Sequence, residues 1–313
     1  MAQLAESLAR LGTESAFDVL ARANQLQQKG KPVINLGIGQ PDFPTPDHVV
    51  EAAIKALRDG HHGYTPAGGI LPLREAVARM FAARYGVTYS PGQVLITPGA
   101  KVIMYLAIMM FGEKGREIIY PDPGFPIYRS LIDYSGATPV PFQLVEGNDF
   151  ALQPDQLLDL VSERTSLVII NSPSNPTGGV ANRDALARLA DGLSQHPHVM
   201  VLSDEIYDRI LFDGHKACSL AEFEALRDQL IILNGWSKSW AMTGWRLGFG
   251  LWPQWCIEPA TRLCINIHSC VNAAAQWAGI AALEGPQDRV EAMVESFQLR
   301  RDVITDRLNA LPM

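Results

Sequence analysis

The chain reads Leu-Ile-Ile-Leu-Asn-Gly-Trp-Ser-Lys over residues 230–238, where an uninterrupted apolar run ends in a polar cluster. A short apolar run without alternation is typical of a strand buried on both faces, as in a parallel sheet covered by helices. We predict a strand here and in six further short runs along the chain. These runs are 94–96, 117–120, 138–140, 167–170, 199–202 and 247–250.

Amphipathic stretches such as residues 183–193 lie between these runs, with apolar residues at helical spacing. This alternation predicts an α/β protein with a three-layer α/β/α large domain around a mostly parallel seven-stranded sheet. We expect residues 46–285 to form that domain. Residues 1–45 and 286–313 would form a smaller, incomplete α+β domain, because the Gly- and Pro-rich stretch before residue 46 marks a crossover between lobes.

Composition excludes several classes of function. The 313 residues carry a net charge of −7 and no basic run, which argues against a nucleic-acid surface. No apolar stretch approaches the roughly 20 residues of a membrane helix, and no secretory signal is visible. The four cysteines form no Cys-x-x-Cys pair, so we expect no metal site, free thiols and a cytoplasmic location.

A polar or glycine-rich cluster follows nearly every predicted strand. These clusters are residues 97–101, 121–125, 171–178, 203–207 and 234–238. In open parallel sheets, ligands bind just beyond the carboxyl ends of the strands. The sequence therefore predicts that the clusters converge at one rim of the sheet and form a site.

Lys238 and Asp204 each come directly behind a buried run, where an unpaired charge is costly. An aldehyde cofactor with a pyridine ring gives both a purpose, since lysine forms a Schiff base and aspartate keeps the ring nitrogen protonated. A phosphate tail would need backbone N–H groups at a helix start and a fixed cation. Gly99 and Ala100, before a predicted helix over 101–111, and Arg246 can supply them.

Three segments in order carry a family resemblance: Asn175-Pro176-Thr177-Gly178, Asp204-Glu205-Ile206-Tyr207, and the stretch from Ser237 to Gly248. With these segments the chain resembles the class I/II aminotransferases of pyridoxal-phosphate (PLP) fold type I, in particular those like aspartate aminotransferase. The resemblance implies a PLP-dependent transfer of an amino group between an L-amino acid and a 2-oxo acid by a ping-pong mechanism. It also implies a homodimer with shared active sites.

The resemblance implies catalytic roles for three residues. Lys238 would hold PLP as a Schiff base and then move the substrate proton. Asp204 would pair with the pyridinium nitrogen. Tyr207, together with Asn175, would hydrogen-bond the phenolic oxygen of the ring.

Further matching positions would hold the rest of the cofactor and the substrate. Phe125 would stack on the ring. Gly99, Ala100, Arg246 and Ser237 would hold the phosphate, and Tyr64 would reach the phosphate of the neighbouring subunit. Gly39 and Asn175 would lie near the substrate. Lys101 would belong to the cofactor-binding residues too. In a subgroup of the family this lysine can also meet the distal carboxylate of an acidic substrate, which favours aspartate or glutamate as amino donor.

The chain departs from the family pattern in two places. Residues 269–273 read Ser-Cys-Val-Asn-Ala instead of a more usual Ser-Asn-Pro pattern, so roles for Ser269 and Asn272 stay open. Family members normally continue well past a sequence like residues 300–312, and that tail carries an arginine for the substrate carboxylate. We therefore expect either an incomplete sequence or a protein that binds cofactor with an impaired substrate site.

Two other nucleotide-binding classes lack their motifs in this sequence. A nicotinamide-binding Rossmann enzyme would need Gly-x-Gly-x-x-Gly, and a P-loop NTPase would need Ser or Thr after Lys101; neither is present. A PLP-dependent β-lyase, a cyclopropane-forming synthase or a decarboxylase would use the same lysine, aspartate and arginine and stays open. So does a truncated module that only binds cofactor or dimerises.

Overall fold

The computed structural model describes residues 2–311 and contains one seven-stranded sheet in the order β1-β7-β6-β5-β4-β2-β3. Every predicted strand is present, with ends that differ by a few residues from the apolar runs. The strands are β1 Val94–Thr97, β2 Glu117–Asp122, β3 Thr138–Gln143, β4 Thr165–Asn171, β5 Met200–Asp204, β6 Leu230–Gly235 and β7 Gly248–Leu251.

The sheet is mostly parallel, as the sequence predicts. Strands β2 to β6 pair in parallel, whereas β7 runs antiparallel to both of its neighbours, β6 and β1. The start of β7 therefore lies at the same rim as the carboxyl ends of β4, β5 and β6. Residues just before β7 meet residues that follow the parallel strands.

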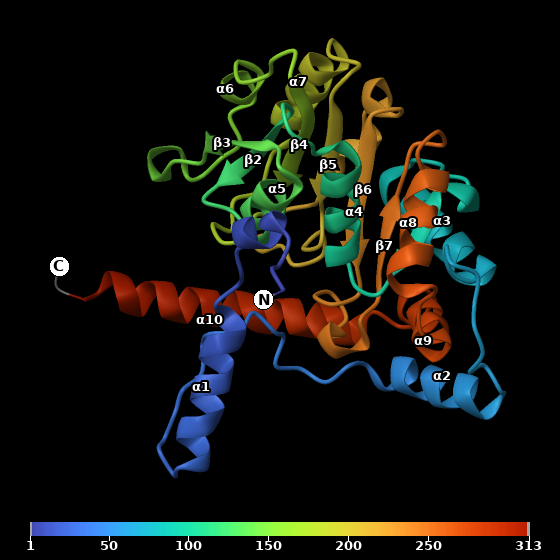
Figure 1. Ribbon diagram of the computed structural model, residues 1–313. Coiled ribbons are helices and arrows are strands. Elements are labelled where there is room, and N and C mark those ends of the chain that lie inside the picture. The colour runs from blue at the N-terminus through green and yellow to red at the C-terminus, as the bar shows by residue number, and fades with distance from the viewer. Residues whose placement is uncertain (1, 312–313) are drawn as a thin grey trace.

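Helices cover both faces of the sheet (Figure 1). The longer helices are α1 Ala16–Gln28, α2 Asp47–Arg58, α3 Leu71–Tyr85, α4 Lys101–Phe111, α5 Ile127–Ser135, α6 Pro154–Leu158, α7 Arg183–Ser194, α8 Ile257–His268, α9 Ala273–Glu284 and α10 Asp288–Asn309. Short 3₁₀ helices are η1 Glu6–Arg10, η2 Pro91–Gln93, η3 Glu146–Asn148, η4 Leu220–Glu222, η5 Glu224–Leu226 and η6 Thr243–Trp245. Within residues 2–311, no helix is long and apolar enough to span a bilayer.

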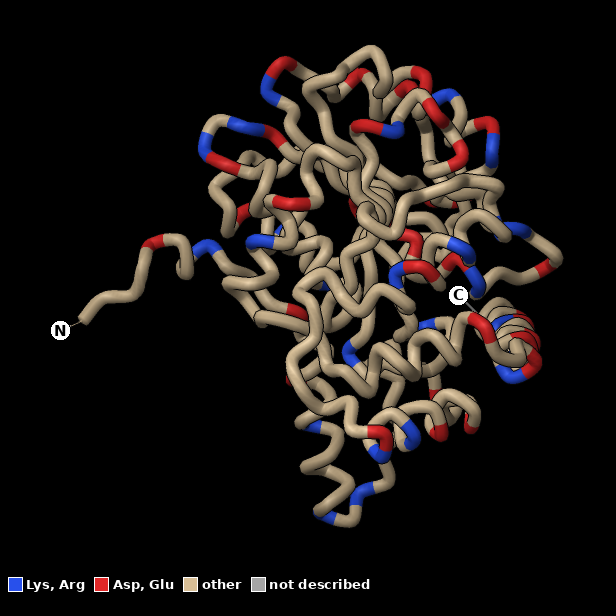
Figure 2. The backbone as a smooth tube through the Cα atoms, turned by 90° about the vertical axis from the view of Figure 1, so that its right-hand side faces the viewer, with Lys and Arg blue, Asp and Glu red and all other residues tan. Residues whose placement is uncertain are grey.

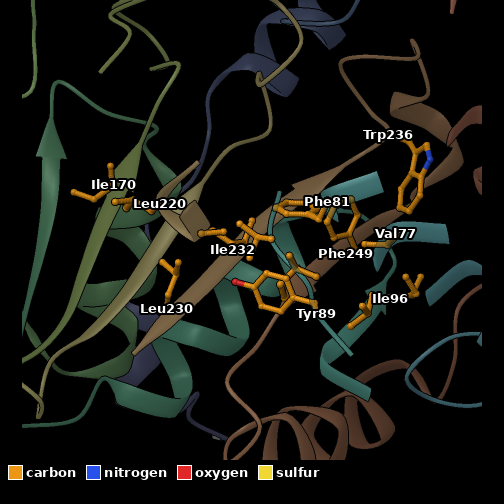
Figure 3. Packing of buried hydrophobic residues seen from close by; sticks show 14 of the residues in the cluster. Val77, Phe81, Tyr89, Ile96, Ile170, Leu220, Leu230, Ile232, Trp236 and Phe249 are labelled. Atoms are coloured by element: carbon orange, nitrogen blue, oxygen red, sulfur yellow. The ribbon is translucent and has the colours of Figure 1, made fainter. Parts of the chain in front are cut away.

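Alternate residues of each strand enter two separate cores, which is the three-layer arrangement that the sequence predicts. In β4, Val168 and Ile170 belong to the core that also contains residues of α2, α3, α7 and α9, whereas Leu167 and Ile169 belong to the core that contains residues of α4, α5 and α8. In the first core, Phe249 lies between Trp236 and Phe81, with ring centroids 5.4 and 6.0 Å apart (Figure 3).

Two helices extend away from this body (Figure 1). In α1 only Ala23 is buried, and in α10 only Val290 and Met293 near its start are. The irregular stretch 29–46 connects α1 to α2. It contacts α10 through Phe43, whose ring packs edge-on against that of Phe297 with the ring centroids 5.3 Å apart. Acidic and basic residues both occur along α10 and are interspersed over the face in Figure 2, as on a solvated surface.

Candidate active site

The clusters behind β4 and β5 lie side by side because the two strands pair in parallel, with Asn171 opposite Asp204. The Asn171 side-chain amide donates to the Asp204 carbonyl at 3.0 Å. Its side-chain oxygen accepts from the Asn175 backbone N–H at 2.8 Å. Asn171 thereby fixes the loop that presents Asn175 beside the end of β5.

Asp204 is a buried carboxylate held from two sides. It accepts a hydrogen bond from the Tyr128 hydroxyl at 2.7 Å and one from the Ile206 N–H at 3.3 Å. Burial raises the pKa of Asp204 to about 6, and these two hydrogen bonds oppose the rise. The sequence did not predict Tyr128 as a site residue. The only feature that could have indicated it is its position one helical turn after Phe125.

Lys238 lies on the loop after β6 and points towards the crossover before α2. Its amino group donates to the Gly39 carbonyl at 2.6 Å and lies 5.9 Å from the centroid of the Tyr207 ring. Burial lowers the pKa of Lys238, although the carboxylates of Glu14 and Asp204 oppose this. The structure thus brings Lys238, Gly39, Tyr207 and Asp204 together.

Gly99 and Arg246 meet at the start of α4. Gly99 has φ +90°, and a Cβ there would overlap the Arg246 guanidinium. That guanidinium donates to the Thr243 carbonyl at 2.8 Å. A flexible cation therefore faces the N-terminal end of a helix, where backbone N–H groups attract anions. Ala100, the residue before α4, is buried beside them.

Lys101 begins α4 and has two neighbours near the site. Its amino group lies 5.1 Å from the centroid of the Phe125 ring and forms a 3.1 Å ion pair with Glu14. Ser237 is buried next to Lys238 in the chain. Glu14 was missed in the sequence, since it lies far from every strand-end cluster and belongs to no motif.

Tyr64 does not join this group within one chain. It is 94% exposed on the loop after α2, beside a surface hollow that Cys270 and Asn272 also line. Asn272 caps α9, because its side-chain oxygen accepts the Ala275 N–H at 2.9 Å. Asn272 therefore has a structural role as a helix cap. Ser269, three residues earlier, has a positive φ of +61°.

A second buried polar group lies behind the site. Glu205 accepts hydrogen bonds from Ser203 and Ser219 at 2.8 and 3.0 Å through one carboxylate oxygen. Its other oxygen has no hydrogen-bond partner. Burial raises the pKa of Glu205 to about 8, against these hydrogen bonds. Sequence reasoning also missed this residue, because Glu205 stands next to Asp204 and its inward direction is visible only in the fold.

The donor set fits a pyridine cofactor with a phosphate tail. An amine, a buried carboxylate with its own hydroxyl partner, and a cradle at a helix start that a Cβ would fill occur at one rim of the sheet. This fold and this donor set are those expected of an α/β enzyme that uses an aldehyde cofactor with a pyridine ring.

A family model described as aminotransferase class I and II matches residues 31–313. The chain belongs to this family. It is therefore a PLP-dependent aminotransferase that transfers an amino group between an L-amino acid and a 2-oxo acid. The resemblance of the three sequence segments is confirmed, and the relatives support this reaction over the lyase and decarboxylase alternatives.

Relatives cover nearly the whole chain. It is 39% identical to the aspartate aminotransferase of Geobacillus stearothermophilus over 99% of this chain and 79% of that protein. Among solved structures, the aspartate aminotransferase of Rhizobium meliloti matches with a TM-score of 0.94 and 35% identity, over 99% of this chain and 78% of that one. The enzyme of Thermus thermophilus with maleate matches with a TM-score of 0.92 and 30% identity, over 99% and 81%.

Proposed function

We propose that Lys238, Asp204 and Tyr207 carry out the amino transfer. The observation that carries the proposal is the Lys238 amino group, which lies at the Gly39 backbone with Asp204 buried nearby. Bound PLP supplies an electron sink that makes the substrate Cα proton acidic. Burial lowers the pKa of Lys238 and so raises the share of its neutral amine. That amine would take the proton from the substrate Cα in one direction of the reaction and return it to Cα in the other.

Asp204 would keep the pyridine nitrogen protonated. Burial disfavours the ionised form of Asp204, so a pyridinium cation beside it would stabilise that form. The hydrogen bond from the Tyr128 hydroxyl holds the Asp204 carboxylate in place. Tyr207 and Asn175 would donate to the phenolic oxygen of the ring. The bond between Asn171 and the Asn175 backbone supports this arrangement by holding Asn175 at the rim.

The remaining cofactor contacts follow from the start of α4. Gly99, Ala100, Ser237 and Arg246 would bind the phosphate, and Phe125 would stack on the ring. Lys101 would lie beside them, at the boundary between cofactor and substrate. The contact between Gly99 and the Arg246 guanidinium supports a shared anion site.

The amino donor that we propose is aspartate or glutamate, and the acceptor is a 2-oxo acid. Relatives named aspartate aminotransferase support this choice. Gly39 and Asn175 would lie at the substrate carboxylate, and Lys101 would lie near the distal carboxylate of an acidic side chain. The Lys101 amino group supports this role through its place over Phe125.

We also propose a homodimer whose subunits share active sites through Tyr64. The exposure of this large aromatic side chain supports a partner contact, since buried phosphate contacts within one chain would hide it. Residues 46–285 would form the large domain, and residues 1–45 with 286–313 the small one; the Phe43–Phe297 contact supports this grouping. The free cysteines support a cytoplasmic location.

A labelling experiment tests the central residue. Borohydride treatment of the PLP-loaded protein should fix a pyridoxyl group on Lys238, as peptide mapping by mass spectrometry would show. Lys238→Ala should carry no label and should lose about a hundredfold or more in kcat, because no amine moves the proton. The exposed Lys216→Ala is the matched control and should label normally. A label on another lysine of the wild-type protein would refute the proposal.

A further inference from the structure

Glu14 is fixed against the body of the protein although it precedes α1. The preceding helix η1 lies against α5 (Figure 1), where Arg10 donates to the carbonyls of Asp133 and Tyr134 at 2.9 and 3.2 Å. Gly12 passes close to Ser130, which leaves a Cβ at Gly12 only 3.4 Å from that side chain. The same helix α5 carries Tyr128, the partner of Asp204. The N-terminal segment is thus held to the wall of the site.

From this position the Glu14 carboxylate enters the site. It forms the 3.1 Å ion pair with Lys101, whose amino group lies over the Phe125 ring. The pair is partly exposed, with 24% of the Glu14 side chain and 43% of the Lys101 side chain accessible. The negative charge of Glu14 also acts on Lys238: burial lowers the pKa of Lys238, and Glu14 opposes that lowering.

An aminotransferase site has to accept two different substrates in turn. A lone lysine in the side-chain subsite suits an acidic side chain, but a neutral side chain would cover that cation and leave it unpaired. A carboxylate of the protein that pairs with the lysine removes this cost. The carboxylate of an incoming acidic substrate can then share the lysine with the protein's carboxylate or displace it, because a partly exposed ion pair is held only weakly.

We infer that Glu14 is a specificity-determining residue, a displaceable counter-ion for Lys101 that lets one subsite accept both acidic and neutral amino acids. The inference rests on the proposed function. With a neutral substrate the ion pair stays closed. With an acidic substrate, the distal carboxylate of the substrate takes over part of the Lys101 charge.

Charge-neutral variants test the inference. Glu14→Gln removes the competing carboxylate and leaves Lys101 unpaired, so kcat/KM should rise about threefold for aspartate and fall about threefold for alanine. In the double variant Glu14→Gln/Lys101→Gln no charge is left unpaired. Its kcat/KM for alanine should therefore recover towards the wild-type value, while that for aspartate falls below the value of Glu14→Gln.

A structural defect would give a different result. The inference would be overturned if Glu14→Gln lowered kcat/KM for aspartate and for alanine by the same factor. It would also be overturned if the double variant had a still lower kcat/KM for alanine than Glu14→Gln. Glu6→Gln is the matched control, an exposed glutamate of the same N-terminal segment, and should leave the ratio of the two substrates unchanged.

A binding measurement separates this inference from the proposed function. Maleate, a dicarboxylate, is titrated into PLP-loaded protein by calorimetry, and Glu14→Gln should bind it about threefold more tightly than wild type. An unchanged dissociation constant would overturn the role of Glu14. Failure of the wild-type protein to convert any amino acid would instead overturn the proposed function, whatever the maleate result.

Discussion

Asp204 and Glu205 are adjacent acids whose side chains enter opposite sides of the sheet. Asp204 meets Tyr128 on the side of α5, whereas Glu205 meets Ser219 at the start of η4. Both carboxyl groups are buried, so each has a raised pKa. Their partners differ: each oxygen of Asp204 accepts a hydrogen bond, one from the Tyr128 hydroxyl and one from the Ile206 N–H, whereas one oxygen of Glu205 has no hydrogen-bond partner. A protonated Glu205 explains how that carboxyl is tolerated.

The stability of the protein should therefore depend on pH through Glu205. Its pKa in the folded chain is about 8, against roughly 4.3 when exposed, so the folded state keeps the proton that the unfolded state releases. The stabilisation is complete below the exposed value and is lost as pH rises through the folded value. Compared with Glu205→Gln, the wild type should lose up to about 1.4 kcal/mol of unfolding free energy per pH unit over that window.

Urea unfolding of both proteins at several pH values measures this difference. Glu163→Gln, a change at an exposed position, should follow the wild type at every pH. A constant difference between wild type and Glu205→Gln across the window would mean that Glu205 is ionised throughout.

Site residues could be predicted from local sequence pattern where they directly flank a buried strand. Lys238, Asp204 and Arg246 flank buried runs, and the structure brings them to one rim. Tyr128 could not be found this way, because its partner Asp204 lies 76 residues further along the chain and no local pattern links them. Glu14 has the same difficulty, with its partner Lys101 separated by 87 residues.

Elements were predicted better than their mutual directions. The helix over 101–111 has the predicted bounds, because a glycine precedes it and Gly112 follows it. Strand β7 was predicted as a run, but its antiparallel direction was not, since a continuous apolar run has no polarity that the sequence reveals. The order of strands in the sheet was likewise beyond local patterns.

The turn before α4 gives a prediction with an internal control. Gly99 and Gly60 have nearly the same backbone, with φ +90° and +91°, but only Gly99 faces Arg246; nothing lies within 4 Å of a Cβ at Gly60. Alanine at either position should cost about 1 kcal/mol of stability, since a side chain is strained in that conformation. Only Gly99→Ala should also displace the guanidinium and raise the Kd for PLP about tenfold.

Thermal unfolding and a spectroscopic PLP titration measure the two effects separately. Equal PLP affinity in both variants would show that Arg246 takes no part in holding the phosphate. A loss of affinity in Gly60→Ala alone would contradict the assignment of the turn at Gly99.

At the scale of the whole molecule, the shared-site dimer predicts complementation between defective subunits. Tyr64→Phe should weaken PLP binding about fivefold, because one hydrogen bond to a charged phosphate is lost. Lys238→Ala should abolish the covalent attachment of PLP. When the two variants are unfolded, mixed and refolded, a hybrid should contain one intact site, with Lys238 from one subunit and Tyr64 from the other.

At limiting PLP, activity and PLP occupancy in the mixture should therefore exceed those of a control mixture in which the two variants are combined without unfolding, and tight PLP binding should return. Sedimentation should show dimers in all samples. If Tyr64 served its own subunit, every hybrid site would be defective and mixing would restore nothing.

The antiparallel entry of β7 has a mechanical consequence for the cofactor. Residues 236–247 form a single loop between β6 and β7, and this loop carries both Lys238 and Arg246. Because both ends of this loop are held in the sheet, the two residues proposed to attach the cofactor would be held rigidly relative to each other. A swing of α10 and the crossover would carry Gly39 towards or away from a stationary cofactor, without stretching it.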